Sequence, residues 1–211
     1  MKMLFLDEHI VVCIKPSGVL STKDSSGKAN MQDMLCSELG VKEVFPVHRL
    51  DREVSGVMVY AISKEAAAKL SATVSDHNRF IKEYLALVEG IPETKEGIME
   101  DLLFKDSSKN KTFVVKKERR GVKCAKLEYR IIEIMGDKTL VRVRLYTGRT
   151  HQIRVQFASR KMPILGDRKY GGRENDGGIE LYSFRLSFAH PISGEKFDYQ
   201  YIPKTLTEYV N

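Results

Sequence analysis

Short runs of apolar residues, separated by polar turns, recur along almost the whole chain. Several of these runs are rich in β-branched residues and stop at a turn containing Gly or Pro, which is typical of β-strands. Between residues 139 and 146, apolar and polar side chains alternate, which gives a strand one apolar face. Strands are therefore predicted over residues 9–15, 56–61, 80–88, 112–117, 123–135, 139–146, 181–189 and 196–202.

Three segments have the composition and end signals of helices. Residues 31–39 follow a capping residue, Asn30, and precede Gly40. Residues 64 to about 74 are rich in Ala and follow Ser63, which can also cap a helix. A third helix is predicted to begin at Thr150 as its cap and to run to about residue 160.

The order of these elements indicates the fold class. Strands outnumber helices, many neighbouring strands are joined by hairpin-length turns, and the order is not a regular alternation of strand and helix. This pattern predicts an α+β fold with a mixed, mainly antiparallel central sheet and flanking helices. Because no low-complexity linker or repeat interrupts the chain, a single domain is predicted over residues 1–211.

Composition excludes several classes of protein. The chain is 42% apolar and 30% charged, as in ordinary globular proteins, and no apolar run approaches the length needed to cross a bilayer. The apolar stretch at the N-terminus is too short for a signal peptide, so a cytoplasmic location without membrane contact is expected. Three widely spaced cysteines and five scattered histidines predict neither a disulfide framework nor a metal site. A monomer is the default expectation.

The positive charge is concentrated in one segment. Nine basic residues and two acids lie between residues 105 and 126, so this segment carries the whole formal net charge of +7. A basic hairpin on a neutral body suggests an arm that binds a polyanion such as RNA. The alternative is a hairpin whose charges face only water, and a charge run by itself favours that alternative.

Residues 45–56 hold the first candidate for chemistry. They contain His48-Arg49-Leu50-Asp51 and lie directly before a predicted buried strand. Asp51 stands between Arg49 and Arg52, and neighbouring cations keep a carboxylate ionised. An ionised carboxylate can act as a nucleophile or a base. The alternative is a cluster of surface ion pairs, which the charge pattern alone favours.

Residues 146–156 hold the second candidate. Gly148 and Arg149 lead into a predicted helix whose start could hold an anion. His151 and Arg154 are three positions apart and therefore share a helix face. The alternative is an ordinary amphipathic helix with its cations in water.

These two motifs occur together with three others, and the set resembles the RluA-type pseudouridine synthases. The resemblance extends from about residue 4 to residue 202. The sequence departs from the family at Glu53-Val54, where Asp-Thr is common, and at Gln156, where His is usual; both departures concern target preference rather than reaction type. The matching marks are His48-Arg49-Leu50-Asp51 with Ser55-Gly56, Lys82 with residues 84–90, Gly148-Arg149 with residues 151–155, Gly166-Asp167 with Tyr170-Gly171, and residues 186–195, together with a Lys-Pro-x-Gly turn at residues 15–18.

The resemblance implies an RNA pseudouridine synthase that isomerises uridine without a cofactor or metal. It makes Asp51 the catalytic aspartate, although the sequence leaves open whether Asp51 acts on the ring, on the sugar carbon or on a sugar proton. Arg154 would pair with Asp51, because a carboxylate that leaves water needs a hydrogen-bonded cation. Tyr84 would stack on the target uracil, and Leu181 would pack against Tyr84.

The resemblance also implies how RNA is bound. The uridine must leave its stack to reach Asp51, Arg49 would fill the vacated space, and His48 would support the loop. The expected partner is ribosomal or transfer RNA, and an appended S4-type domain is not expected. Further RNA contacts are expected from Arg149, His151, Lys116, Lys117, Arg119, Arg120 and Lys123.

Three rival functions each account for less of the sequence. A catalytically inactive RNA-binding module would explain the basic segment but not the joint presence of Asp51, Tyr84 and Arg154. A nucleoside hydrolase would normally need a second carboxylate as its acid, and none stands out in these motifs. A purely structural domain leaves the whole set of motifs unexplained.

Overall fold

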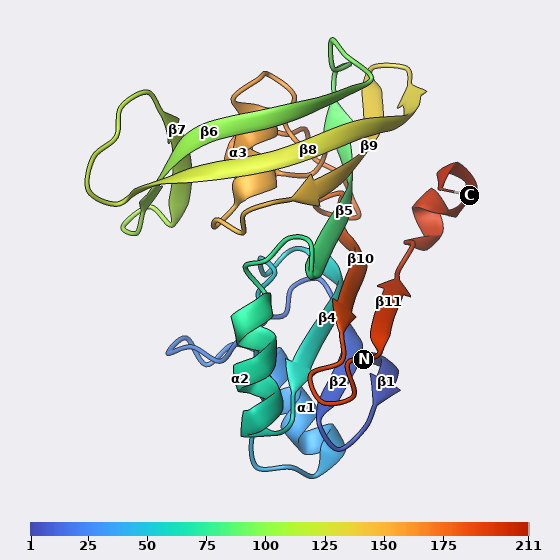
Figure 1. Ribbon diagram of the computed structural model, residues 1–211. Helices are drawn as coiled ribbons and strands as arrows, with labels where there is room; N and C mark the ends of the chain where they lie inside the picture. Colours follow the sequence, from blue (N-terminus) through green and yellow to red (C-terminus); the bar gives the residue numbers. More distant parts are fainter. Residues whose placement is uncertain (211) are drawn as a thin grey trace. The chain divides into compact units, whose positions relative to one another are not determined.

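The computed structural model describes residues 1–210, and the chain separates into two compact units (Figure 1). Unit 1 comprises Met1–Lys82 and Ser183–Tyr201, and unit 2 comprises Glu83–Tyr182 with the residues from Ile202 onward. The chain passes from one unit to the other within β5, within β10 and again after Tyr201. The single domain expected from the sequence stays a prediction.

Unit 1 is a sheet with two helices. Its strand order is β1-β2-β4-β10-β11, and β3 pairs with part of β4. β2 runs antiparallel to both β1 and β4, and β11 runs antiparallel to β10. The elements are β1 (Lys2–Leu6), β2 (Ile10–Lys15), α1 (Met31–Leu39), β3 (Phe45–Pro46), β4 (Ser55–Ala61), α2 (Lys64–Thr73), β10 (Leu181–Ala189, in this unit from Ser183) and β11 (Lys196–Gln200).

Both helices of unit 1 have the ends that their sequences predict. The Asn30 side chain accepts a hydrogen bond from the Asp33 amide, and Gly40 ends α1 in the left-handed conformation. The Ser63 side chain accepts from the Ala66 amide at the start of α2. These caps satisfy amide groups that a helix end otherwise leaves without a partner.

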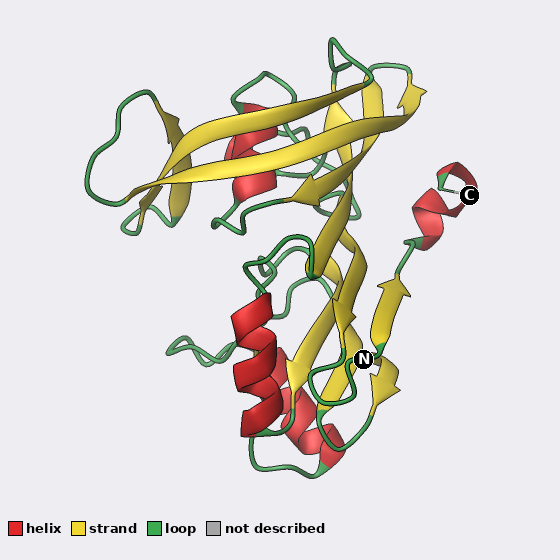
Figure 2. Ribbon diagram, in the orientation of Figure 1, coloured by secondary structure: helices red, strands yellow, loops and turns green. Residues whose placement is uncertain are grey.

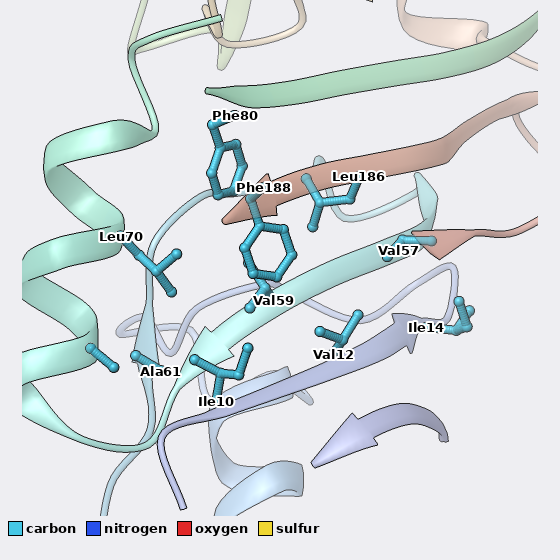
Figure 3. Packing of buried hydrophobic residues seen from close by; sticks show 11 residues of the cluster. Ile10, Val12, Ile14, Val57, Val59, Ala61, Leu70, Phe80, Leu186 and Phe188 are labelled. Carbon is cyan, nitrogen blue, oxygen red and sulfur yellow. The ribbon is translucent and has the colours of Figure 1, made fainter. Parts of the chain in front are cut away.

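One apolar cluster joins the sheet of unit 1 to α2 (Figure 3). Alternate residues of β2 and β4 point to the same side, and Leu70 of α2 belongs to the same cluster. Phe80 and Phe188 close the cluster with stacked rings whose centroids are 5.6 Å apart. The buried members are Ile10, Val12, Ile14, Val57, Val59, Ala61, Ala66, Leu70, Phe80, Leu186 and Phe188.

Unit 2 is an antiparallel sheet with one helix on it, so strands predominate here as well (Figure 2). Its strand order is β5-β9-β8-β6-β7. Val155 of α3 packs against Leu103 and Ala125 of the sheet. The elements are β5 (Phe80–Glu89, in this unit from Glu83), β6 (Glu96–Asp106), β7 (Lys111–Val115), β8 (Val122–Met135), β9 (Lys138–Leu145), α3 (Gln152–Ala158) and the two 3₁₀ helices η1 (Arg168–Tyr170) and η2 (Lys204–Tyr209).

The α+β class with a mainly antiparallel sheet is confirmed, but the sequence patterns missed three strands: β1, β6 and the two-residue β3. β1 is a short, largely exposed strand next to β2, and β6 carries charged residues among its apolar ones. Only Met99 and Leu103 of β6 are buried, so its alternation is weak. No helix among the described residues is long and apolar enough to cross a membrane.

The basic segment differs from the simple hairpin predicted over residues 105–126. β7 pairs with one side of β6, and β8 pairs with the other side. β7 ends opposite Leu102 and β8 begins opposite Phe104, so residues 116–121 cross over β6 there instead of forming a tight turn between β7 and β8. The Arg119 guanidinium lies 4.5 Å from the centroid of the Phe104 ring, a contact that fits this crossing.

Gly56, the second residue of β4, can be tested for its packing role. Its φ is +128°, and a Cβ at this position would lie 2.2 Å from the Ser183 carbonyl oxygen. We expect Gly56→Ala to lower the free energy of unfolding by about 3 kcal/mol or more, because backbone atoms of two strands would have to separate. Urea denaturation measures this change.

Gly40→Ala is the matched control, because Gly40 also has a positive φ, but a Cβ added to it would meet no atom within 4 Å. Only the conformational strain of about 1–2 kcal/mol should remain in that variant. Equal losses in the two variants would contradict the close approach of β4 and β10.

Candidate active site

Asp51 lies in the loop of residues 47–54 that leads into β4, as the sequence predicts. Leu50 before it and Val54 after it are buried, whereas Asp51 itself is only partly buried. The Val54 amide donates to the Asp51 carbonyl at 3.1 Å, which closes a turn around the aspartate. The carboxylate is thus carried by a short turn whose two flanking apolar residues are fixed in the core.

The buried side chain of Lys15 holds this loop through hydrogen bonds. Lys15, the last residue of β2, is fully buried, and its Nζ donates to the carbonyl oxygens of Pro16 at 2.9 Å, Val19 at 2.7 Å and Arg52 at 2.9 Å. The Gly18 amide donates to the same Arg52 carbonyl at 2.9 Å. The residue next to Asp51 is therefore tied to the turn that follows β2.

The charge of Lys15 belongs to the electrostatics of the loop. Burial lowers the pKa of the Lys15 ammonium to about 8, while the carboxylates of Glu53 and Asp51 raise it and partly oppose the effect of burial. At neutral pH the group is still protonated, and three carbonyl oxygens accept its three protons. From the sequence, Lys15 was identified only as part of a turn motif; its place at the end of a wholly apolar strand is the signal that could have revealed its burial.

Ser21 provides a second anchor for the loop. Its Oγ donates to the Leu50 carbonyl and accepts from the Leu50 amide, both at 2.9 Å. The Tyr60 hydroxyl donates to the Ser21 carbonyl at 2.8 Å, which links this anchor to β4. The peptide groups on both sides of Leu50 are thereby held by buried partners.

His48 contacts the protein backbone, and Arg49 is exposed. The His48 Nε2 accepts from the Val59 amide at 3.2 Å, and its ring meets Phe80 edge-on with centroids 5.6 Å apart. Burial lowers the pKa of His48 to about 3, with a smaller contribution from the charge of Lys82. His48 is therefore neutral near pH 7, and its role toward RNA stays a prediction.

Arg154 is placed in unit 2 by a buried ion pair. It lies on α3 with 4% of its surface exposed, and its Nε and Nη2 donate to the two carboxylate oxygens of Asp167 at 2.7 and 2.8 Å. The guanidinium carbon lies 5.3 Å from the centroid of the Tyr170 ring. Asp167 belongs to one of the sequence motifs but was not predicted as a site residue. The predicted pair of Arg154 with Asp51 joins residues of different units and stays a prediction.

The start of α3 corrects one expectation. Thr150 does not cap the helix; His151 occupies the cap position with φ +54° and makes no side-chain cap hydrogen bond. Instead the Gln152 Oε1 accepts from the Arg149 amide at 3.0 Å and from the Thr147 hydroxyl at 2.7 Å. The Thr150 carbonyl accepts from the Thr112 hydroxyl at 2.9 Å, a tertiary contact that fixes the residue before the cap but satisfies no amide of the helix.

Tyr84 and Leu181 are both buried in unit 2. Tyr84 lies on β5 opposite Val143 of β9, and Leu181 is the first residue of β10. Next to Tyr84, the Glu83 carboxylate pairs with Arg142 at 2.6 Å. The stacking of Tyr84 on a base and the packing of Leu181 against it stay predictions.

The cations of the basic segment are available to a ligand. Lys116, Lys117, Arg119, Arg120 and Lys123 are all exposed, and none of them forms an ion pair within the part of the chain that the structure describes. Arg149 is exposed too, but its Nε donates to the Cys124 carbonyl at 2.9 Å. Over residues 1–210, no group of three His, Cys, Asp or Glu side chains is arranged to hold a metal ion.

Comparison with known proteins identifies relatives. Residues 9–159 match the family model for RNA pseudouridylate synthase. The chain is 32% identical over 221 residues to the ribosomal large subunit pseudouridine synthase D of Zymomonas mobilis, covering 94% of this chain and 68% of that protein. It is 33% identical over 202 residues to the dual-specificity RNA pseudouridine synthase RluA of Salmonella typhimurium, covering 94% and 91%.

The fold also matches solved structures. The human RNA pseudouridylate synthase domain containing 4 superposes with a TM-score of 0.78 at 21% identity, covering 99% of this chain and 91% of that one. The human RNA pseudouridylate synthase domain containing 1 superposes with a TM-score of 0.76 at 22% identity, covering 99% and 85%. At this level of identity the two structures support the fold alone.

The buried Lys15 ammonium should give the protein a distinctive pH dependence. The pKa of Lys15 is about 8 in the folded protein and returns to roughly 10.4 in the unfolded chain. Between these two pH values the unfolded chain binds more protons than the folded protein, so the free energy of unfolding rises with pH. The stability gained in this way is lost again as the pH falls through 8. We expect the stability of the wild type relative to Lys15→Met to increase by on the order of 3 kcal/mol from pH 7 to pH 10.5.

Urea denaturation of both proteins at a series of pH values measures this difference, and other titrations cancel between them. Lys64→Met is the control, because Lys64 is exposed on α2 and should leave the stability profile unchanged. A constant difference between the wild type and Lys15→Met over the whole range would show that Lys15 is not buried as described.

Proposed function

Because the chain belongs to the RNA pseudouridylate synthase family, we propose that Asp51 carries out its isomerisation of uridine to pseudouridine in structured RNA. The observation that carries this proposal is the fixed loop of residues 47–54 within the family motif. Lys15 and Ser21 hold the backbone on both sides of Asp51 through buried hydrogen bonds. A reacting carboxylate has to be positioned within a fraction of an ångström, and a loop held in this way can do so.

Arg154 is proposed to orient the Asp51 carboxylate. Asp167 fixes the plane of the guanidinium through two parallel hydrogen bonds, a geometry that only arginine offers. A guanidinium fixed in this way can present its remaining edge to a second carboxylate with little loss of side-chain entropy. Tyr84 is proposed to stack on the target uracil, with Leu181 as a wall, and both side chains are already buried.

The RNA substrate is proposed to be ribosomal or transfer RNA. Two of the relatives are named for the ribosomal large subunit and for dual specificity. The uridine would leave its stack, Arg49 would fill the space, and the backbone would lie along Lys116, Lys117, Arg119, Arg120 and Lys123, with Arg149 and His151 near the start of α3. The reaction is proposed to need no cofactor, and the protein to act as a cytoplasmic monomer.

Replacement of Asp51 tests the catalytic role. Asp51→Asn keeps the shape of the side chain but removes the charge that a nucleophile or base requires, so we expect the rate to fall by at least about 10⁴-fold. Release of tritium from RNA labelled at uracil C5 measures the rate. Glu65→Gln, an exposed carboxylate on α2, is the control and should keep full activity.

The same assay separates the rival functions. Wild-type protein that releases no tritium from any cellular RNA would be an RNA-binding module. Free uracil as the product would identify a nucleoside hydrolase. Comparing pseudouridine maps of RNA from cells with and without this protein then assigns the modified position.

The basic segment makes a separate prediction about salt. A variant with Lys116, Lys117, Arg119 and Arg120 all changed to Ala should bind RNA more weakly. Its affinity should also depend less on salt, with the slope of log K against log[salt] reduced by up to about 3. Titrations at several salt concentrations measure both effects. A Lys42→Ala/Lys64→Ala variant, which removes exposed lysines of unit 1, should bind like the wild type, and an unchanged slope in the quadruple variant would refute the role of the segment.

A further inference from the structure

The hydroxyl of Tyr170 contacts two segments with different proposed roles, β7 and the start of α3. It accepts a hydrogen bond from the Thr112 amide at 2.8 Å, near the start of β7. It also lies 2.9 Å from Nδ1 of His151, the cap residue that precedes α3. The ring of the same tyrosine lies against the Arg154 guanidinium at 5.3 Å. One side chain therefore contacts β7, the start of α3 and the proposed orienting arginine.

Other contacts hold the start of β7 to the same place. The Thr112 hydroxyl donates to the Thr150 carbonyl at 2.9 Å. Lys169, next to Tyr170, donates from Nζ to the Asn110 carbonyl at 3.0 Å, and the Lys111 ammonium lies 5.1 Å from the Tyr170 ring centroid. β7 then leads directly into residues 116–121, which carry four exposed cations. A movement of that loop caused by bound RNA can reach Tyr170 through one short strand.

The chemistry of the hydroxyl suits a connecting role. A tyrosine hydroxyl has one proton to donate and can accept as well. It accepts from the Thr112 amide, and its own proton can go to His151 Nδ1 when His151 is in the tautomer with its proton on Nε2. Burial raises the pKa of Tyr170, so the hydroxyl keeps its proton at neutral pH.

We propose that Tyr170 is a positioning residue that couples RNA bound along residues 116–121 to the orientation of Arg154. The inference rests on the proposed roles of Arg154 and of the basic segment. Asp167 fixes the in-plane direction of the guanidinium, and the Tyr170 ring supports its face. RNA that orders the loop would hold the Thr112 amide, the Tyr170 hydroxyl and the start of α3 in the arrangement that presents Arg154 to Asp51. Coupling of this kind needs a contiguous set of contacts, which this network supplies.

Tyr170→Phe tests the proposal, because it keeps the ring on Arg154 and removes only the hydroxyl. We expect the single-turnover rate at saturating RNA to fall about tenfold, while the dissociation constant for RNA stays within about twofold. In the background of the quadruple alanine variant of Lys116, Lys117, Arg119 and Arg120, the same substitution should change the saturated rate by less than about twofold, since bound RNA no longer orders the loop.

Tyr129→Phe is the matched control. Tyr129 is a buried tyrosine of unit 2, whereas Tyr170 is partly buried, and the Tyr129 hydroxyl is 3.0 Å from the Thr94 hydroxyl, away from the contacts that join β7 to Arg154. The control should lose a hydrogen bond and a similar amount of thermal stability without a change in rate. This comparison separates coupling from simple loss of stability.

Three outcomes decide the matter. An unchanged saturated rate in Tyr170→Phe, with an active wild type, would overturn this inference and leave the proposed function intact. A rate loss of the same size in both backgrounds would overturn the coupling, since Tyr170 would then act independently of the basic segment. Absence of tritium release from the wild type would overturn the proposed function and this inference with it.

Discussion

The candidate site in unit 1 depends on one buried cation, the ammonium group of Lys15. A charge can be buried only when hydrogen bonds replace the water that it loses. The carbonyl oxygens of Pro16, Val19 and Arg52 replace that water here, so the end of β2, the following turn and the residue beside Asp51 are organised around the same atom. The geometry of the Asp51 loop thus follows from the need of the Lys15 ammonium group for hydrogen-bond acceptors.

A comparable constraint organises unit 2. Arg154 and Asp167 are both almost wholly buried and pair through two hydrogen bonds. Breaking such a pair by removing one partner leaves a buried charge, which is far more damaging than losing a surface ion pair. The helix that carries Arg154 has only seven residues, and its start lacks a side-chain cap. Two tertiary hydrogen bonds hold this start in place: Gln152 Nε2 donates to the Lys126 carbonyl, and the Thr112 hydroxyl donates to the Thr150 carbonyl. In each unit, a buried and hydrogen-bonded cation therefore lies among the candidate site residues.

Much of the fold could be predicted from local pattern. The strand over residues 181–189 and the helix over residues 31–39 have the predicted bounds, because strong apolar runs and clear capping residues mark them. β6 was missed because only two of its residues are buried and charged side chains interrupt its apolar ones. The cap of α3 was predicted wrongly at Thr150 because capping propensity favours Thr, whereas the folded chain places His151 at the cap position in the left-handed conformation.

The sequence by itself determined the family, the α+β class and the identity of the candidate residues, because these follow from motifs and periodicities that are written along the chain. Only the tertiary structure decided how those residues are held. It showed that Lys15 supports the Asp51 loop, that Asp167 fixes Arg154, and that Tyr170 connects β7 to α3. The reason is physical: these partners are separated by 13 to 58 positions along the chain, and a hydrogen bond depends on distance in space rather than on separation in sequence.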